Sequence, residues 1–287
     1  MDTSSSPSIL KPLPRAVENV ADDPSLHNPK QRLERMSTGW MGVILEYEGV
    51  VVEDTSDLHM SAWLQLATEE GKPRPLQWAV KKAQGMKNEQ VIQEVFCWTR
   101  NPSEVRRLAT RHEEIYKKLL GDRKPMVPSG VRNLLDTLAK HNVPVALACS
   151  APEARIKAAL RDTELAGSFD AVVTAEDVYR GRPDPESYVY AAQQLGRPPV
   201  RCVVIGNSNQ SVEAARECGM QCVVVAGRNP IYELTAADLV VRQLEELSFI
   251  NLKQLFRNEQ GVAPQPQEEE EAEPQPMSLT QTLTMDY

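Results

Sequence analysis

Short apolar runs that alternate with helical patterns constrain the fold of this chain more than any other feature. The first run, Met41 to Leu45, is continuous rather than alternating, which is typical of a strand buried on both faces of a parallel sheet. Similar runs recur at 143–149, 169–174, 202–206 and 221–226, and segments with helical periodicity separate them. This order predicts an α/β fold built on a doubly wound parallel sheet.

One long interval breaks the alternation. From about Asp57 to Pro125 no strand-like run occurs, and apolar residues recur only with helical spacing. We therefore expect an all-helical cap over 57–125, inserted after the first strand into a core made of 39–56 and 126–257. A cap over the carboxyl ends of parallel strands would enclose the place where α/β sheets normally bind ligands.

The two ends of the chain have compositions that cannot build a core. Residues 1–38 combine many prolines and serines with mixed charges, and residues 258–287 alternate Pro, Gln and Glu. We expect both segments to be disordered. The acidic tail is typical of a solvated extension, and the sequence assigns it no partner.

Charge and hydropathy argue against several classes of function. The chain has 32 Lys and Arg against 40 Asp and Glu, for a net charge of −8, and the segment 259–287 holds seven of the acidic residues with no Lys or Arg. The remaining −1 leaves a nearly neutral body, which favours neither nucleic acid nor an anionic membrane as a partner. No apolar run approaches the roughly 18 residues of a spanning helix, so we expect a soluble protein.

Four short motifs follow the predicted strands in a fixed order. They are Glu-Tyr-Glu-Gly-Val-Val at 46–51, Ala-Leu-Ala-Cys-Ser at 146–150, Gly-Arg-Pro-Asp-Pro at 181–185 and Gly-Asn-Ser-Asn at 206–209. In their order and spacing, over roughly residues 40 to 250, the chain resembles the haloacid dehalogenase superfamily, and most closely its helical-cap branch of β-phosphoglucomutase-like and CbbY-like proteins. The resemblance implies a Rossmann-like core, a helical cap and phosphoric monoester hydrolase (phosphatase) activity.

Further segments extend the resemblance beyond these motifs. Residues 42–54, 85–90 and 176–181 are similar to the plant plastid phosphatases that act on 5-amino-6-(5-phosphoribitylamino)uracil in riboflavin biosynthesis. This similarity implies a small phosphorylated metabolite as substrate and a plastid location. The acidic residues of the N-terminal segment instead favour the cytoplasm, because transit peptides are poor in acidic residues.

The resemblance also implies roles for the charged residues. Glu46 stands where the family has the Asp that attacks phosphorus, and Glu48 stands where a second Asp protonates the leaving oxygen and later activates water. Mg²⁺ would be bound by the carboxylate of Glu46, the main-chain carbonyl of Glu48 and the side chain of Asn207. Cys149, with Ser150 beside it, and Arg182 occupy the positions that hold the phosphoryl oxygens.

The sequence says less about the roles of one cap residue and two histidines. Lys87, in the segment 85–90, either reaches the substrate phosphate or only begins a solvated helix. His59 and His112 have no partner at ligand spacing, so a metal role is not expected for them.

The sequence departs from the family pattern at four of the motif positions. Glu in place of Asp at 46 and 48 adds a methylene, and a shift of about 1 Å in a nucleophile can lower a rate about 10²-fold. Asn207 removes a charge from the metal shell, and Cys149 donates hydrogen bonds more weakly than Ser or Thr. Two functions therefore stay open: a phosphatase, or a catalytically degenerate member that keeps the fold to bind a ligand or a protein partner.

Overall fold

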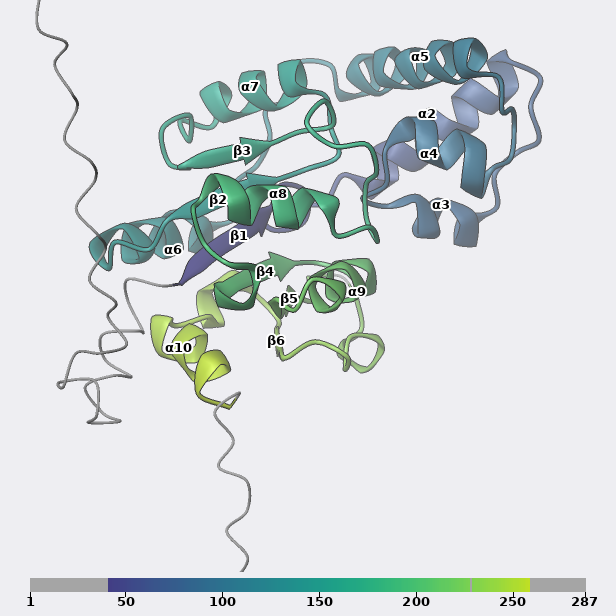
Figure 1. Ribbon diagram of the computed structural model, residues 1–287. Helices are drawn as coiled ribbons and strands as arrows, with labels where there is room; N and C mark the ends of the chain where they lie inside the picture. The colour runs from purple at the N-terminus through teal and green to yellow at the C-terminus, as the bar shows by residue number, and fades with distance from the viewer. Residues whose placement is uncertain (1–40, 228, 259–287) are drawn as a thin grey trace, which may run out of the picture.

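The computed structural model describes residues 41–227 and 229–258 (Figure 1). The disorder predicted for the two ends falls outside these residues, apart from Asn258, which ends the last helix. Among the described residues, no helix has both the length and the apolar character needed to cross a membrane.

Six parallel strands form a single sheet. They are β1 (Gly42–Glu46), β2 (Val145–Ala148), β3 (Ala171–Val173), β4 (Cys202–Gly206), β5 (Gln221–Val225) and β6 (Leu239–Val241). Their order is β3-β2-β1-β4-β5-β6, which confirms the doubly wound α/β fold. The direction of winding reverses between β1 and β4, and ligands bind beside such a switch point, outside the carboxyl ends of the strands.

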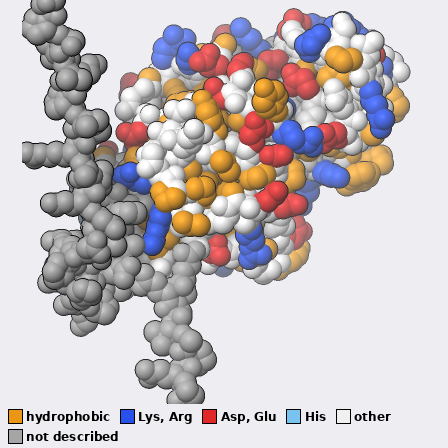
Figure 2. All heavy atoms as spheres, in the orientation of Figure 1, with side chains coloured by type: hydrophobic (Ala, Val, Ile, Leu, Met, Phe, Trp, Pro, Cys, Tyr) orange, Lys and Arg blue, Asp and Glu red, His pale blue; other side chains and the backbone are white. Residues whose placement is uncertain are grey.

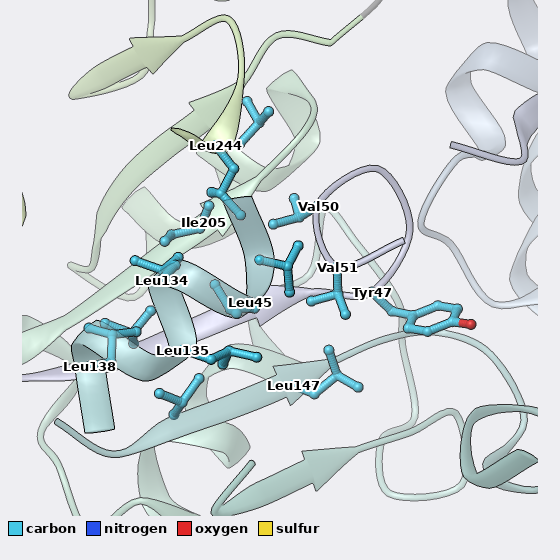
Figure 3. Packing of buried hydrophobic residues seen from close by; sticks show 14 of the residues in the cluster. Leu45, Tyr47, Val50, Val51, Leu134, Leu135, Leu138, Leu147, Ile205 and Leu244 are labelled. Atoms are coloured by element: carbon cyan, nitrogen blue, oxygen red, sulfur yellow. The ribbon is translucent and has the colours of Figure 1, made fainter. Parts of the chain in front are cut away.

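Helices cover both faces of the sheet. One face packs against α6 (Ser129–Lys140), α7 (Glu153–Asp162) and α10 (Phe249–Asn258), and the other against α8 (Glu186–Gln194) and α9 (Asn209–Glu217). Figure 3 shows Leu45, Leu147 and Ile205 of three strands packed against leucines of α6. Because alternate residues of β1 point to opposite faces and both faces are covered, the strand needs a continuous apolar run.

Short 3₁₀ turns complete the core. They are η4 (Pro199–Arg201), η5 (Ile231–Glu233) and η6 (Leu244–Glu246).

The segment between β1 and β2 begins with a purely helical cap. It contains α2 (Ser56–Glu69), α3 (Gln77–Ala83), α4 (Asn88–Gln90), a π-helical turn η3 (Val91–Val95) and α5 (Pro102–Leu120). These helices bury an apolar cluster of their own, which includes Trp63 and Leu108. The cap lies beyond the carboxyl end of β1 (Figure 1).

Polar contacts join the cap to the core. Nζ of Lys87 donates to the carbonyl oxygens of Ala175 and Val178, at 2.6 and 2.7 Å, and Oγ of Ser150 donates to the carbonyl oxygen of Gly85 at 2.6 Å. The cap and the core therefore contact each other directly at these two places.

On the face seen in Figure 2, the acidic and basic side chains of the described residues are intermingled.

Candidate active site

A cavity of about 530 Å³ lies between the cap and the carboxyl ends of the central strands. Five of the seven predicted site residues line it: Glu48, Cys149, Ser150, Arg182 and Asn207. They meet because the loops after β1, β2, β3 and β4 open on the same edge of a parallel sheet. The other two predicted residues, Glu46 and Lys87, do not line this cavity.

Glu46 ends β1 with its carboxylate buried beneath the cavity. Its Oε2 lies 2.5 Å from Nη1 of Arg182 and accepts a hydrogen bond from the backbone N–H of Asn207 at 3.3 Å. Its Oε1 accepts a hydrogen bond from the hydroxyl of Tyr188 in α8. A Cβ added at Gly206 would lie 2.4 Å from Cβ of Ser211 and 3.1 Å from Cδ of Glu46, so glycine makes room for the carboxylate.

Arg182 lies in the segment between β3 and α8 and holds several groups through one nitrogen. Its Nη1 donates to Glu46, to Oγ of Ser211 at 3.0 Å and to Oγ of Ser208 at 3.4 Å. Burial opposes the charge, but Glu46, Tyr188 and Glu48 outweigh it and raise the pKa of Arg182. The guanidinium therefore stays positively charged at any physiological pH.

Glu48 faces the cap. Its Oε1 lies 3.2 Å from Nε2 of His59 in α2 and 3.2 Å from Nη2 of Arg155 in α7. Burial raises the pKa of Glu48, but His59 together with Arg155 and Arg182 outweighs burial and lowers the pKa to about 2. Glu48 is therefore ionised at neutral pH.

Arg155 links the core to the cap. Its Nε lies 3.5 Å from Oε1 of Glu113 in α5, and its guanidinium stacks 4.5 Å from the ring centroid of Tyr116 in the same helix. The position of Glu48 is therefore coupled to the packing of two cap helices, α2 through His59 and α5 through Arg155.

Cys149, Ser150, Asn207 and Asn229 are neutral groups on the core side of the cavity. Sγ of Cys149 lies 3.3 Å from the carbonyl oxygen of Val173, and burial raises the pKa of this thiol to about 12, so it stays protonated. Nδ2 of Asn229 donates to the carbonyl oxygen of Asn207 at 3.0 Å, and both asparagines line the cavity. Ser150 also lines the cavity, although its hydroxyl donates to the cap.

Lys87 lies at a different place. It lines a neighbouring cavity of about 600 Å³, and two of its three N–H donors bond to the backbone of the core. In this arrangement Lys87 fastens the cap to the core. A contact of Lys87 with a substrate phosphate stays a prediction.

The two glutamates of the predicted magnesium site have different side-chain partners. Glu46 turns toward Tyr188, Glu48 turns toward His59, and each carboxylate has an arginine of its own. In the part of the chain that the structure describes, no three His, Cys, Asp or Glu side chains gather in a way that could hold a metal ion. Mg²⁺ requires a near-octahedral shell of oxygen ligands, and Oε2 of Glu46 already accepts from Arg182 and from the backbone of Asn207, so the residues as arranged leave Mg²⁺ no free position on this oxygen.

Three residues at the site were not predicted. His59 was considered only for its spacing to other histidines, and nothing in the local sequence shows that α2 begins over Glu48. Tyr188 lies at a buried helical position, which is typical of an ordinary core aromatic. Arg155 lies five residues after Ser150, so its place in the first turn of the helix that follows the second motif was a usable signal.

The matching family model is described as haloacid dehalogenase-like hydrolase and covers residues 49–225, more than half of the chain. It begins directly after Glu48, so the segment with both glutamates precedes it. A plant relative, the 5-amino-6-(5-phospho-D-ribitylamino)uracil phosphatase, chloroplastic, of Arabidopsis thaliana, is 50% identical over 238 residues, which are 83% of this chain and 64% of the relative. The chain thus spans less than two thirds of this relative's length.

More distant relatives share the architecture. The β-phosphoglucomutase of Bacillus subtilis (strain 168) is 28% identical over 215 residues, which cover 72% of this chain and 91% of that protein. The crystal structure of a β-phosphoglucomutase from Clostridium difficile superimposes with a TM-score of 0.67 at 21% identity, over 77% of this chain and 98% of the other. At that identity the structural match shows the fold alone.

Proposed function

This chain belongs to the haloacid dehalogenase-like hydrolases, and from that premise we propose that it is a phosphatase that hydrolyses a small phosphorylated metabolite. The observation that carries the proposal is the 50% identity to the plant phosphatase over 83% of this chain, which includes the cap as well as the core. The comparisons do not favour the degenerate alternative, because several relatives are named as phosphatases.

The substrate we propose is 5-amino-6-(5-phospho-D-ribitylamino)uracil, the compound in the plant relative's name. A cavity of about 530 Å³ is in the range of small-molecule sites. Its cap side offers polar side chains suited to a ribityl chain, among them Gln77, Gln84 and Asn88, and it offers Met60 and Trp63 as apolar surface for a ring. These features support a polyol phosphate that carries an aromatic group.

Arg182 is the residue we propose to bind the phosphoryl group. The side-chain hydrogen bonds of Arg182 to the described residues all use Nη1, which leaves Nε and Nη2 without an acceptor among these residues. A guanidinium can bind two phosphate oxygens at once. Asn207 lines the same cavity and would add an amide contact, whereas Ser150 donates its one hydroxyl proton to Gly85 in this arrangement.

The nucleophile we propose is Oε2 of Glu46. This oxygen contacts Arg182 and Asn207, which both line the cavity, whereas Oε1 faces the buried Tyr188. Oε2 forms a bond to phosphorus as the bond from phosphorus to the leaving oxygen breaks. Attack of water on phosphorus then breaks the acyl phosphate, releases inorganic phosphate and restores the carboxylate.

Glu48 and His59 are proposed to act as an acid/base pair. With a pKa of about 2, Glu48 alone holds almost no proton to give to the leaving oxygen at neutral pH. An imidazole nitrogen can accept or donate a proton, and Nε2 of His59 is hydrogen-bonded to the carboxylate. The pair would pass one proton to the leaving group and remove one from the attacking water.

Cofactor and location are less closely supported. Phosphatases of this family generally use Mg²⁺. For this chain Mg²⁺ at Glu46, Glu48 and Asn207 stays a prediction, and the contacts already made by Oε2 of Glu46 do not support it. A plastid location is the one that the plant relative's name favours, and the cytoplasm is the alternative from the sequence.

A substrate panel tests the proposed function. Phosphate release would be measured from 5-amino-6-(5-phospho-D-ribitylamino)uracil, FMN, fructose 1-phosphate and β-glucose 1-phosphate, with and without Mg²⁺. We expect the highest kcat/KM for the ribitylaminouracil phosphate. Release from none of these compounds, in either buffer, would contradict the phosphatase and leave the fold as a binding module.

A further inference from the structure

We propose that the guanidinium of Arg182 takes the place of the divalent cation in this site, so that the protein binds a phosphate group without Mg²⁺. The proposal rests on the proposed function for its choice of ligand. It is carried by the contacts of Glu46, Arg182 and Gly85.

The carboxylate of Glu46 has little capacity left for a metal ion. A carboxylate accepts about four hydrogen bonds or ligand bonds. In this structure Oε1 accepts from Tyr188, and Oε2 accepts from Arg182 and from the backbone of Asn207. Three of about four positions are therefore taken, including both on Oε2, so a Mg²⁺ bound to this oxygen would have to displace Arg182 or the backbone of Asn207.

The one carboxylate among the predicted metal ligands is paired with a cation. Glu46 pairs with Arg182 at 2.5 Å and Asn207 is neutral, whereas Arg155 is shared between Glu48 and Glu113. An ion bound to Oε2 of Glu46 would lie next to a fixed positive charge that is 13% exposed at its side chain. Arg182 therefore repels a second cation at Oε2 of Glu46, where the family resemblance places Mg²⁺.

Arg182 is held firmly enough to act as a resident cation. Beyond its ion pair with Glu46, its Nη1 donates to Ser208 and Ser211 at the start of α9. Its backbone N–H donates to the carbonyl oxygen of Gly85 in the cap at 3.0 Å. A cation fixed before the ligand arrives needs no reorganisation when the phosphate binds.

The cap is shaped around this guanidinium. Gly85 has a φ of +76°, and a Cβ added there would lie 2.3 to 2.4 Å from Nε, Cζ and Nη2 of Arg182. Any side chain at this position would collide with the edge of the guanidinium that carries the free donors. Glycine at position 85 therefore leaves room for the wide, planar head group of arginine. The narrower head group of a lysine would not need this room.

Calorimetry on the full chain tests the proposal without relying on turnover. The protein would first be treated with EDTA. It would then be titrated with inorganic phosphate, once in buffer with EDTA and once in buffer with MgCl₂. A separate sample would be titrated with MgCl₂ alone. We expect dissociation constants for phosphate that agree within about twofold, and no saturable heat from MgCl₂ alone. Saturable binding of Mg²⁺ alone, phosphate binding only with Mg²⁺, or no phosphate binding in either buffer would overturn the proposal.

A pair of arginine variants shows whether the effect belongs to Arg182. Arg182→Gln should weaken phosphate binding at least tenfold, whereas Arg161→Gln, an exposed arginine of α7, should leave it unchanged. Equal phosphate affinities of the two variants would contradict the proposal. Circular dichroism checks that both are folded, and if Arg182→Gln is not, the wild-type comparison decides alone.

The failures of the two proposals are distinguishable. Turnover that requires Mg²⁺ would support the phosphatase and overturn the resident cation. Phosphate binding that is insensitive to EDTA, with no turnover on any substrate, would support the resident cation and contradict the phosphatase.

Discussion

The hydroxyl of Tyr188 donates a hydrogen bond to Oε1 of Glu46, although 142 positions separate the two residues in the sequence. Both residues are only 1% exposed. The contact gives a physical reason for Glu in place of the family's Asp. The additional methylene carries the carboxylate to α8, where Tyr188 takes one oxygen and leaves the other beside Arg182 and Asn207.

Tyr188→Phe removes the donor and leaves a buried carboxylate oxygen unpaired. Loss of one partner of a buried hydrogen bond costs roughly 1–3 kcal/mol. For Tyr188→Phe we expect a decrease of that size in the free energy of unfolding, measured by denaturant titration. We also expect a lower kcat, because Oε2 of Glu46 is no longer held in place. Tyr190→Phe, on the same helix, is the matched control, because the Tyr190 hydroxyl makes no hydrogen bond to the described residues, and it should change neither quantity.

A double-mutant cycle separates the contact from general damage to the core. Glu46→Asp should leave the hydroxyl of Tyr188 unpaired, so its cost should be smaller in the Tyr188→Phe background. A coupling free energy of about 0.5–3 kcal/mol is typical of residues in contact. Additive effects would show that the hydrogen bond is not formed in solution.

Gly85→Ala should weaken phosphate binding about tenfold or more, because the new Cβ displaces the guanidinium of Arg182. Gly71→Ala is a close control: it also has a positive φ, +57°, but a Cβ there meets nothing within 4 Å. Both variants should share a backbone strain of roughly 1–2 kcal/mol in unfolding experiments. Equal phosphate affinities in the two variants would contradict the role given to Gly85.

His59→Gln should lower kcat by about 10² to 10⁴, the usual contribution of a positioned acid or base, with KM changed by about threefold at most. The control is His141→Gln, since His141 is exposed at the end of α6. Steady-state kinetics on the preferred substrate make the comparison. A kcat that stays at the wild-type value would remove His59 from the acid/base pair.

His112 should make the cap sensitive to acid. Its ring stacks 3.7 Å from Trp63, it is fully buried, and neither ring nitrogen has a hydrogen-bond partner among the described residues. Burial, followed by the charges of His59 and Arg155, holds the pKa of His112 well below 6.5. In the folded protein this ring is neutral, whereas in the unfolded chain it binds a proton near pH 6.5.

The unfolded state therefore binds more protons below about pH 6.5, and the stability contributed by neutral His112 is lost as the pH falls through that value. As the pH falls from about 7 to about 5, the free energy of unfolding should fall less for His112→Phe than for the wild type. His141→Gln should keep the wild-type slope. Equal slopes for wild type and His112→Phe would show that the buried imidazole is not the cause.

The sequence was a reliable guide to the sheet because burial on both faces requires continuous apolar runs. The five predicted runs coincide with β1 to β5. The sixth strand, Leu239–Val241, was not predicted, since three residues at the edge of a sheet leave almost no pattern. The π-helical turn Val91–Val95 was not predicted either, because its apolar spacing resembles that of an α-helix.

The site was predictable to the extent that topology alone defines it. Motifs that follow parallel strands must meet at one edge, and so Glu48, Arg182 and Asn207 line a common cavity. The direction of the Glu46 side chain was not predictable, because it depends on Tyr188 and on the space that Gly206 leaves. Contacts across the cap, such as those of Lys87 and His59, depend on how the cap packs on the core.

The most direct test of the account is the initial rate of phosphate release from 5-amino-6-(5-phospho-D-ribitylamino)uracil by the wild type, Glu46→Gln and Glu53→Gln. Glu53 is an exposed carboxylate seven positions from Glu46 and serves as the control. We predict turnover by the wild type and by Glu53→Gln, and a loss of at least about 10³-fold in Glu46→Gln, which keeps the shape but not the charge of the nucleophile. Equal rates in the wild type and in Glu46→Gln, or no release by the wild type, would contradict a phosphatase that works through Glu46.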